Sequence, residues 1–402
     1  MKVLVIDEEV PYPLNSGKRL RTFNLLKNLS PKHDILFICR EYEDGEGIYS
    51  QALEDIGIKT IVVHHPIRKK VGIKFLFALF FNIFSKYPYT VASHFSNELI
   101  KELNIIKQKE KFDVIHCEWT PYAINTMSIH DIPIVVDAHN VEAMIWQRYY
   151  EIESNPFKKG YLYLQWKKML NFEKVTFNKF NKIVAVSQND KKIISQFVDE
   201  DKIRVVDNGV DTDYFSSLGN DEDNFSLIFS GAMDWRPNVD AMFFFLDEIW
   251  PNILSSHPIC SLTIVGRNPL QVLKDRIKNT TSVTLTGTVD DVRPYIDRSS
   301  IFIVPLRVGG GSRLKILEAL SMKKPVVSTS IGAEGLDVEN GKDIIIADDT
   351  GSFTKAIELL FNDSQLRRTL GNAGRTLVED KYQWKVISDK LEKVWIEVSR
   401  SV

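Results

Sequence analysis

A run of three glycines, Gly309 to Gly311, separates a strongly apolar stretch from a segment with helical periodicity. Glycines let a ligand approach the backbone closely, and the free N–H groups at a helix N-terminus suit phosphate. We expect Ser312 to cap this helix, with Arg313 and Lys315 in its first turn. Cations at this end of a helix oppose its dipole unless an anion is bound, so the sequence predicts a phosphate site. The alternative is a flexible loop in which Lys315 forms a surface ion pair with Glu318.

Polar side chains also follow two apolar stretches of the N-terminal half. His139 comes directly after one stretch, and His116, Glu118 and Tyr122 lie at the end of another. Histidine titrates near neutral pH and can act as a general acid or base. His139 is therefore a candidate for proton transfer or for binding a hydroxyl. The alternative is a buried histidine whose hydrogen bonds are satisfied within the core.

The composition is that of an ordinary globular protein. The chain has 402 residues, with 51 Lys and Arg against 53 Asp and Glu, so the near-zero net charge argues against a nucleic-acid partner. Cys39, Cys117 and Cys260 are odd in number and far apart, which excludes a disulfide scaffold and zinc-ligand spacing. Val3–Ile6 is too short for a signal peptide, and Phe75–Phe81 is far short of the roughly 20 apolar residues that span a membrane. We expect a cytoplasmic protein, soluble or peripheral to the inner face of the cell membrane.

Short apolar stretches alternate with segments of helical periodicity along the whole chain. This alternation predicts parallel sheets with crossover helices, and about thirteen strands are too many for one sheet. We expect an N-terminal domain over residues 1–210, to which a C-terminal helix at about 385–402 returns, and a second domain over 211–384. Ligands bind such sheets in the loops after the strands. The expected strands are 2–6, 34–39, 60–63, 114–116, 134–138, 182–186, 203–206, 226–230, 261–265, 283–286, 301–305, 325–328 and 344–347.

The most specific motif runs from Pro305 through Glu318-Ala-Leu-Ser-Met-Lys-Lys-Pro-Val-Val to Gly332-Ala-Glu-Gly-Leu. Further motifs precede it in order: Asp113-Val-Ile-His116, Asp137-Ala-His139-Asn-Val-Glu142, Val184-Ala-Val-Ser187, Asn208-Gly-Val-Asp211, Phe229-Ser-Gly231 and Leu285-Thr-Gly-Thr-Val289. Together they cover nearly the whole chain, and they resemble the retaining nucleotide-sugar glycosyltransferases of family 4. The resemblance implies an α/β protein of the GT-B fold, with two facing Rossmann-like, doubly wound parallel-sheet domains and an interdomain cleft.

The resemblance also assigns roles to individual residues. Glu318 would hold the nucleotide ribose, His139 would lie beside the reacting sugar, and these two are the candidate catalytic residues. His116, Glu118 and Tyr122 fall on the acceptor side. The implied residues that bind the sugar donor are Gly17, Gly231, Arg236, Val289, Gly310, Gly311, Ser312, Arg313, Leu314, Lys315 and Glu318.

The chain departs from the family pattern at two places. The family carries a glutamate eight positions before Glu318, where this chain has Gly310, so either glycine N–H groups replace that contact or a differently shaped sugar is bound. The basic residues that often follow the strand matching Phe229–Gly231 are absent, and Arg236, Arg313 and Lys315 are the expected substitutes. Near Gly17, we expect at least two of Lys18, Arg19 and Arg21 to face solvent.

The implied reaction transfers a sugar from a nucleotide diphosphate to a glycan or lipid-linked glycan in surface polysaccharide assembly. In the usual proposal for retaining enzymes of this type, the leaving diphosphate helps to deprotonate the acceptor, so the protein supplies positioning and charge stabilisation. No Asp-x-Asp motif lies in a fitting place, so we predict neither a metal nor a cofactor. The alternatives are a non-catalytic sugar-nucleotide-binding or scaffold protein, and a nucleotide-sugar epimerase on the same scaffold.

Residues 68–86 and 158–182 are basic and aromatic. No acidic residue occurs between Ile56 and Asn97, and seven lysines accompany the single Glu173 in the second segment. Basic amphipathic helices with aromatic residues are typical of membrane interfaces. Two interpretations remain: contact with an anionic membrane, or packing of the apolar face into the N-terminal core. As a helix, the first segment would place on one face Ile73, Phe77, Phe80, Phe81 and Phe84.

Overall fold

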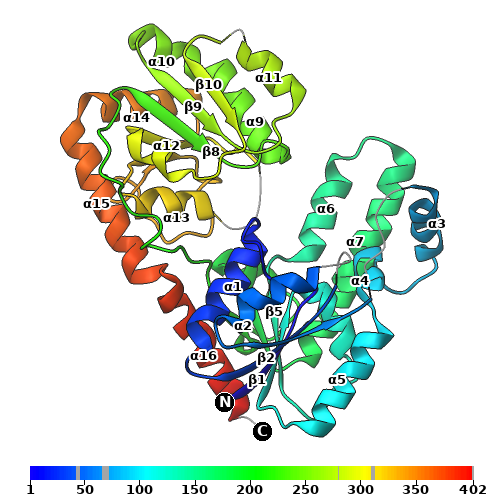
Figure 1. Cartoon of the computed structure of the whole chain (residues 1–402). Helices are drawn as coiled ribbons and strands as arrows, with labels where there is room; N and C mark the ends of the chain where they lie inside the picture. The colour runs from blue at the N-terminus through cyan, green and yellow to red at the C-terminus, as the bar shows by residue number, and fades with distance from the viewer. Residues whose placement is uncertain (42–45, 66–71, 279, 309–312, 401–402) are drawn as a thin grey trace. The chain divides into compact units, whose positions relative to one another are not determined.

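The computed structural model describes residues 1–41, 46–65, 72–278, 280–308 and 313–400 (Figure 1). The chain forms two compact units. Unit 1 consists of Met1–Asp207 together with Ile387–Val402, and unit 2 consists of Asn208–Val386. Unit 1 is therefore built from both ends of the chain, whereas unit 2 is one continuous segment.

Unit 1 is built on a seven-stranded sheet in which all neighbouring strands are parallel. From edge to edge the order is β3-β2-β1-β4-β5-β6-β7. Val3 to Ile6 of β1 are fully buried, as expected for a strand whose two faces are both covered. The strands are β1 (Lys2–Ile6), β2 (Asp34–Arg40), β3 (Lys59–Val63), β4 (Val114–Glu118), β5 (Ile134–Ala138), β6 (Lys182–Ala185) and β7 (Ile203–Val205).

Helices connect these strands, because parallel neighbours need a crossover. The longest, α7, has 24 residues and is capped by Asn155, whose side chain accepts from the N–H groups of Phe157 and Lys158. The helices of unit 1 are α1 (Gly17–Leu29), η1 (Glu46–Ser50), α2 (Gln51–Glu54), α3 (Gly72–Asn82), α4 (Tyr89–His94), α5 (Asn97–Lys109), η2 (Thr120–Thr126), α6 (Glu142–Ile152), α7 (Pro156–Lys179), α8 (Gln188–Ile194), η3 (Glu200–Lys202) and most of α16 (Trp384–Ser399).

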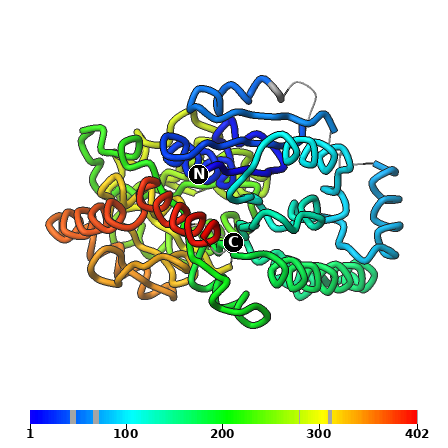
Figure 2. The backbone as a smooth tube through the Cα atoms, turned by 90° about the horizontal axis from the view of Figure 1, so that it is seen from below, coloured from blue at the N-terminus to red at the C-terminus, as the bar shows by residue number. Residues whose placement is uncertain are grey.

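The two ends of the chain lie close together in unit 1 (Figure 2). The Ser399 hydroxyl lies 3.4 Å from the Met1 sulfur, and the Lys32 ammonium of the α1–β2 loop contacts Asp389 and Glu392 of α16 at 2.8 Å each. Trp395 of α16 is fully buried. The last helix is therefore an integral part of the unit 1 core.

Unit 2 is built on a six-stranded parallel sheet in the order β10-β9-β8-β11-β12-β13. Its strands are β8 (Ser226–Ser230), β9 (Ser261–Val265), β10 (Val283–Gly287), β11 (Ile301–Val304), β12 (Val326–Ser328) and β13 (Ile345–Ile346). Its helices are α9 (Arg236–Phe244), the π-helical η4 (Phe245–Ile249), α10 (Trp250–Ser256), α11 (Gln271–Lys278), α12 (Arg293–Arg298), α13 (Leu314–Ser321), α14 (Thr350–Asn362) and α15 (Ser364–Lys381). The prediction of two doubly wound α/β sheets is confirmed.

The strand order reverses once in each sheet. In unit 1 the chain builds outward from β1 through β2 and β3, then returns to place β4 on the other side of β1. In unit 2 the chain likewise builds outward from β8 through β9 and β10, then returns to place β11 on the other side of β8. At such a switch point the loops leaving two adjacent strands diverge, and ligands bind there. The loops after β1 and β4, and those after β8 and β11, are therefore the places to look for a site.

Among the residues that the structure describes, no helix is both long and apolar enough to cross a membrane.

Candidate functional site

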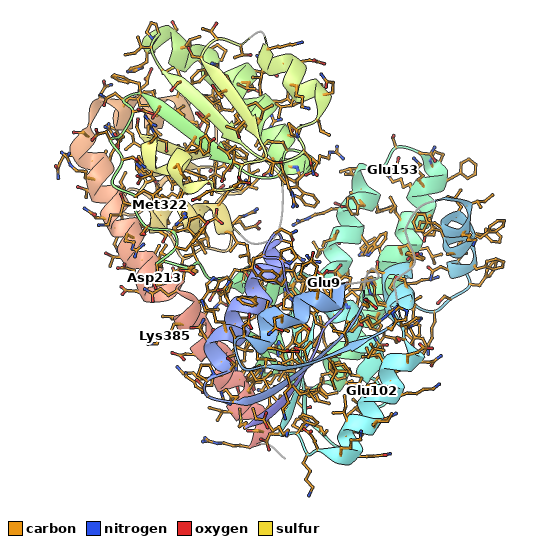
Figure 3. All side chains as sticks on the ribbon, in the orientation of Figure 1. Glu9, Glu102, Glu153, Asp213, Met322 and Lys385 are labelled. Carbon is orange, nitrogen blue, oxygen red and sulfur yellow. The ribbon has the colours of Figure 1, made fainter. Side chains whose placement is uncertain are left out.

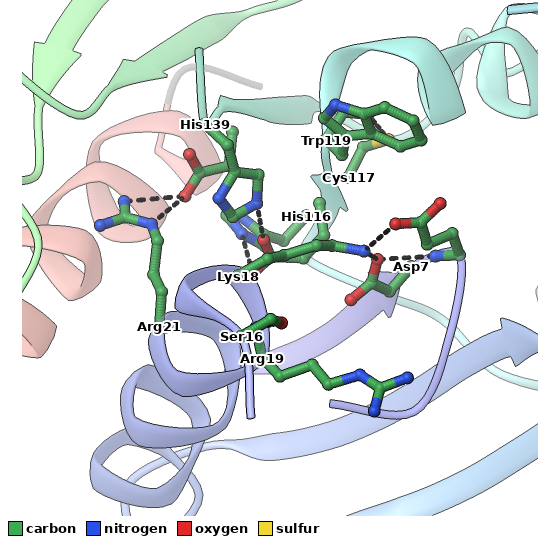
Figure 4. A network of polar contacts seen from close by, with 12 residues as sticks. Asp7, Ser16, Lys18, Arg19, Arg21, His116, Cys117, Trp119 and His139 are labelled. Atoms are coloured by element: carbon green, nitrogen blue, oxygen red, sulfur yellow. Dashed lines mark hydrogen bonds and ion pairs between the residues drawn. The ribbon is translucent and has the colours of Figure 1, made fainter. Parts of the chain in front are cut away.

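Charged side chains gather at the switch point of unit 1, where β1, β4 and β5 end and α1 begins (Figure 4). Most are almost completely buried. Buried charges are tolerated only when they are paired or hydrogen-bonded, so the contacts within this group decide its chemistry. We call the group the polar cluster; it consists of Asp7, Lys18, Arg21, His116, Glu118, Asp137 and His139.

The carboxylate of Glu118 lies between two histidine rings. Its Oε1 contacts His116 Nε2 at 3.2 Å, and its Oε2 contacts His139 Nε2 at 2.7 Å. Burial by itself would raise the pKa of Glu118, but the hydrogen bonds from both rings outweigh it and hold that pKa well below its usual range. Glu118 is therefore a buried carboxylate that remains ionised.

The protonation of His116 follows from its second hydrogen bond. The indole N–H of Trp395 donates to His116 Nδ1 at 3.2 Å. An indole nitrogen can only donate, so Nδ1 must accept and carries no proton. The remaining proton of the ring lies on Nε2 and points at Glu118. We therefore assign His116 as a neutral ring that fixes the Glu118 carboxylate in place.

His139 differs from His116 because one of its ring nitrogens is left open. Burial lowers the pKa of His139, but the negative charges of Asp137 and Glu118 outweigh burial and raise it. Its Nε2 faces Glu118, whereas its Nδ1 has no hydrogen-bond partner among the described residues. A ring held by one carboxylate and open at its other nitrogen can bind a hydroxyl or transfer a proton.

Lys18 of α1 is paired with the two carboxylates that follow β1. Its Nζ lies 2.6 Å from Asp7 Oδ1 and 2.8 Å from Glu8 Oε1. Burial lowers the pKa of Lys18, but Asp7, Glu8 and Glu9 together outweigh it and raise that pKa above its ordinary value. Lys18 is therefore charged and fixed at the switch point.

The other two cations in the first turns of α1 are paired as well. Arg21, which is buried, contacts Asp137 Oδ2 through Nη2 at 2.9 Å and donates to the Asp207 carbonyl at 2.8 Å. Arg19 forms an ion pair with Glu9. The expectation that at least two of Lys18, Arg19 and Arg21 face solvent is therefore wrong. The loop after β1 folds its carboxylates back over the start of α1, and the periodicity of the sequence does not reveal this.

Two further buried carboxyl groups, those of Glu142 and Glu173, lie at the N-terminus of α6. Glu173 of α7 accepts hydrogen bonds from the backbone N–H groups of Glu142 and Ala143, at 2.7 and 3.2 Å. Glu142 in turn accepts from the indole of Trp119 at 2.8 Å. Burial and the nearby charge of Glu142 raise the pKa of Glu173 to about 8. The single acidic residue of the basic segment 158–182 is thus a buried helix cap.

Three members of the polar cluster are close enough to approach one ion. One ligand atom each from His116, Glu118 and Asp137 lie within 4.8 Å of one another. However, the Nε2 proton of His116 points at Glu118, and Arg21 neutralises Asp137. A metal would have to displace that proton and compete with a guanidinium, so this donor set fits a hydrogen-bonded network better than a metal centre.

In unit 2, Lys315 lies in α13 at the switch point, where the loops after β8 and β11 diverge. Its Nζ donates to Asn238 Oδ1 at 2.9 Å and lies 4.1 Å from the centre of the Phe229 ring. A Cβ at Gly231 would stand 2.7 Å from that Nζ and 2.8 Å from Asn238 Nδ2, so a side chain at this position would displace both groups. Burial lowers the pKa of Lys315 to about 7. Lys315 forms no ion pair with any residue that the structure describes.

Glu318 lies one turn further along the same helix. Burial raises the pKa of Glu318 to about 7. Within the described part of the chain its carboxylate makes neither a hydrogen bond nor an ion pair, so the surface ion pair with Lys315 is not formed. A partly buried cation and a partly buried carboxyl group, neither of which forms an ion pair with a described residue, are typical of a site that a ligand completes.

The start of α13 differs from the sequence-based expectation. Arg313 is its N-cap rather than a first-turn residue, and its guanidinium donates to the Ile331 carbonyl at 2.7 Å. Leu314 is the first residue of the helix. Gly310, Gly311 and Ser312 lie outside the described residues.

The remaining predicted residues are spread over both units. Gly17 begins α1, and Arg236 begins α9 with an exposed side chain. Val289 packs against the core of unit 2. Tyr122 is fully buried in unit 1, and burial raises its pKa well above the ordinary value.

Sequence reasoning missed several partners of the predicted residues. Asn238 positions Lys315, Trp395 fixes His116, and Asp137 pairs with Arg21. Only Asp137 carried a signal, because it is the one charged residue of an apolar strand and lies inside a recognised motif. Asn238 and Trp395 are far from their partners in sequence, and only the fold brings them there.

Two family models match this chain. One, described as Glycosyltransferase Family 4, matches residues 19–214, and the other, described as Glycosyl transferases group 1, matches residues 224–363. The chain belongs to the glycosyltransferases of family 4 and group 1. Its fold is GT-B, as the sequence predicts.

Named relatives of this glycosyltransferase extend over its whole length. An uncharacterised 44.6 kDa protein in the cps region of Klebsiella pneumoniae is 26% identical, covering 96% of this chain and 98% of that protein. The UDP-Gal:alpha-D-GlcNAc-diphosphoundecaprenol alpha-1,3-galactosyltransferase of Escherichia coli is 24% identical, covering 96% and 95%. Sucrose-phosphate synthase from Thermosynechococcus elongatus has the same fold, with a TM-score of 0.73, 14% identity and complete coverage of both chains.

Proposed function

We propose that this glycosyltransferase moves a sugar from a nucleoside diphosphate to a glycan or lipid-linked glycan, with retention of anomeric configuration, in surface polysaccharide assembly. The cps-region relative and the relative that acts on a diphosphoundecaprenol-linked sugar support this substrate class. The observation that carries the proposal is the pair Lys315 and Glu318, which lies at the switch point of unit 2 and forms no ion pair within the part of the chain that the structure describes.

A nucleoside diphosphate supplies what both side chains lack. The diphosphate places negative charge beside Lys315 and the N-terminus of α13, and the ionised Glu318 accepts hydrogen bonds from the two ribose hydroxyls. As the sugar–phosphate bond breaks, negative charge grows on the departing diphosphate. Lys315 stabilises that charge more strongly than it stabilises the intact substrate.

His139 binds a hydroxyl of the transferred sugar through its open Nδ1, and Glu118 acts as the positioning residue that holds the ring. The acceptor oxygen bonds to the anomeric carbon on the face from which the diphosphate leaves, and the diphosphate takes the acceptor proton. This step needs no nucleophile from the protein. Lys315, Arg236 and the helix N-termini take the role that a metal ion has in other transferases, so we propose that neither metal nor cofactor is required.

A thermal-shift screen with UDP, GDP, ADP and TDP and their sugars, with and without EDTA, tests this proposal. A ligand that binds only the native state raises the midpoint by mass action. We expect nucleotides of one base to raise the thermal midpoint of the wild type, with the same shift in the presence of EDTA. The control Glu358→Ala on α14 should show this shift, and Glu318→Ala should not. Nuclear magnetic resonance of the product then gives the anomeric configuration.

Two results would contradict the proposal. If no nucleotide shifts the midpoint at millimolar concentration, the site on α13 does not bind a sugar donor, and a non-catalytic scaffold becomes the better interpretation. If Glu318→Ala and Glu358→Ala respond alike, Glu318 does not hold the ribose.

A further inference from the structure

Helix α3 of unit 1 presents a continuous apolar stripe to solvent (Figure 3). The spacing of these residues places them on one side of the helix. Each is between 54% and 77% exposed, which is unusual for large apolar side chains gathered at one place. We call them the α3 stripe; they are Ile73, Leu76, Phe77, Phe80, Phe81 and Phe84.

The opposite side of α3 is fixed to the rest of unit 1. The Phe75 ring packs edge-on against Tyr89 of α4, with ring centres 5.5 Å apart. The buried Asn82 side chain donates to the Tyr87 carbonyl at 3.1 Å and accepts from Gln165 of α7 at 2.9 Å. These contacts hold the helix so that the stripe cannot turn inward. Packing of this apolar face into the core, one of the two interpretations of the sequence, is therefore wrong.

Lysines lie on and next to the helix that carries the α3 stripe. Lys74 is an exposed residue of α3 itself, Lys86 follows the stripe in the chain, and Lys168 of α7 donates to the Asn82 and Ile83 carbonyls at 2.7 and 3.0 Å. At the start of α7, Lys158 is exposed beside Phe157, whose side chain is 89% exposed. No acidic residue lies between Ile56 and Asn97 to balance Lys74 and Lys86.

We propose that the α3 stripe docks this protein on the surface of an anionic lipid bilayer. The aromatic and aliphatic side chains enter the boundary between acyl chains and headgroups, and Lys74, Lys86 and Lys158 contact the anionic headgroups. Charge complementarity favours lipid over a second copy of this chain, because two such faces brought together would oppose lysine to lysine. The proposal does not depend on the sugar donor or on catalysis.

Flotation with lipid vesicles tests the docking surface on the full chain. We expect the wild type to float with vesicles of phosphatidylcholine and phosphatidylglycerol, and much less with phosphatidylcholine alone. The variant Phe77→Ser/Phe80→Ser/Phe81→Ser should stay in solution, whereas Ile259→Ser, at an apolar residue of unit 2 that is even more exposed, should float like the wild type. Unchanged circular dichroism and an unchanged thermal midpoint show that the triple variant is folded.

Charge reversal measures the contribution of the lysines to lipid binding separately from that of the apolar stripe. Lys74→Glu/Lys86→Glu/Lys158→Glu should lower the partition coefficient for anionic vesicles by at least about a hundredfold, since each lysine near such a surface contributes about fivefold. Lys274→Glu on α11 is the control and should have no effect. Equal partitioning of the reversed variant and its control would overturn the proposed headgroup contacts.

A fluorescent probe reports whether the stripe itself enters the bilayer. All three native cysteines are buried, so a dye attaches selectively to the cysteine of Phe81→Cys or of the control Ile259→Cys. We expect vesicles to shift the emission to the blue at position 81 only. The proposal is overturned if wild type does not float, if position 81 shows no blue shift, or if light scattering without lipid shows a dimer that the triple serine variant converts to a monomer.

Discussion

Raising the pH should weaken the binding of a sugar nucleotide because Lys315 loses its charge. In the unbound protein, burial lowers the pKa of Lys315 from 10.5 to about 7. A bound diphosphate stabilises the ammonium and raises that pKa again. Binding then takes up a proton whenever the pH is above about 7, and by linkage the affinity falls as the pH rises.

The size of the effect follows from the fraction of Lys315 that is protonated before binding. With a pKa of about 7, that fraction is about one half at pH 7 and about 1% at pH 9, so the affinity falls about 50-fold. A lysine of ordinary pKa would change the affinity by less than about twofold over this range. Glu318, with a pKa also raised to about 7, becomes fully ionised and offsets at most about a factor of two.

Isothermal titration calorimetry of the sugar nucleotide with the largest thermal shift measures this dependence directly. Its diphosphate diester does not titrate in the range, and buffers of different ionisation enthalpy count the proton taken up. Lys315→Met should bind weakly and lose the alkaline fall, whereas Lys355→Met, exposed on α14, should behave as the wild type. If the affinity of the wild type changes by less than about twofold between pH 7 and pH 9, burial does not lower the pKa of Lys315 as argued.

Three further predictions follow from the described contacts. His139→Ala should lower the turnover number about tenfold to a hundredfold, the value of one lost hydrogen bond to the sugar, with little change in nucleotide affinity, measured by transfer kinetics and calorimetry; equal losses in both would remove His139 from the reacting sugar. Gly231→Ala should push the Lys315 ammonium and the Asn238 amide out of place, because the new Cβ would stand 2.7 and 2.8 Å from them, and should lower nucleotide affinity about tenfold; the backbone at φ +155° disfavours a side chain, so the urea midpoint should fall as well. The pKa of Glu173 is raised to about 8 in the folded protein, so the unfolded chain binds fewer protons, and the free energy of unfolding should fall as the pH rises from about 5 to about 8. In urea titrations, Glu173→Gln should make the free energy of unfolding less dependent on pH. An equal pH dependence of the variant and the wild type would contradict a buried, protonated cap.

Strand positions could be predicted closely from the sequence, since a parallel strand covered on both faces is a short apolar run with little ambiguity. All thirteen expected strands are present, with ends displaced by one or two residues, as for 114–116 against Val114–Glu118. The parallel direction of the strands followed from their alternation with helices, whereas their order within each sheet was not predicted. These features depend on local composition, which the sequence displays directly.

The site was harder to predict from the sequence than the strands, because the residues that contact one another in it are distant in sequence. Residue types at strand ends indicated His139, Glu118 and Lys315, but not what each one touches. The carboxylates that neutralise Lys18 and Arg21 come from other strand ends, and a periodic pattern contains no information on such pairings. The pKa directions of the buried groups could be assigned only from these contacts and from burial.

The hydrogen bond between Trp395 and His116 joins residues 279 positions apart. During synthesis, β4 leaves the ribosome long before the helix that supplies this indole. Unit 2, a continuous segment, can complete its core first, while unit 1 waits for residues 387–399. A chain stopped shortly before its end would therefore carry every residue of the polar cluster and still leave His116 without the donor that fixes its proton. Quality control that detects an exposed unit 1 core would thus also remove chains with an incomplete site.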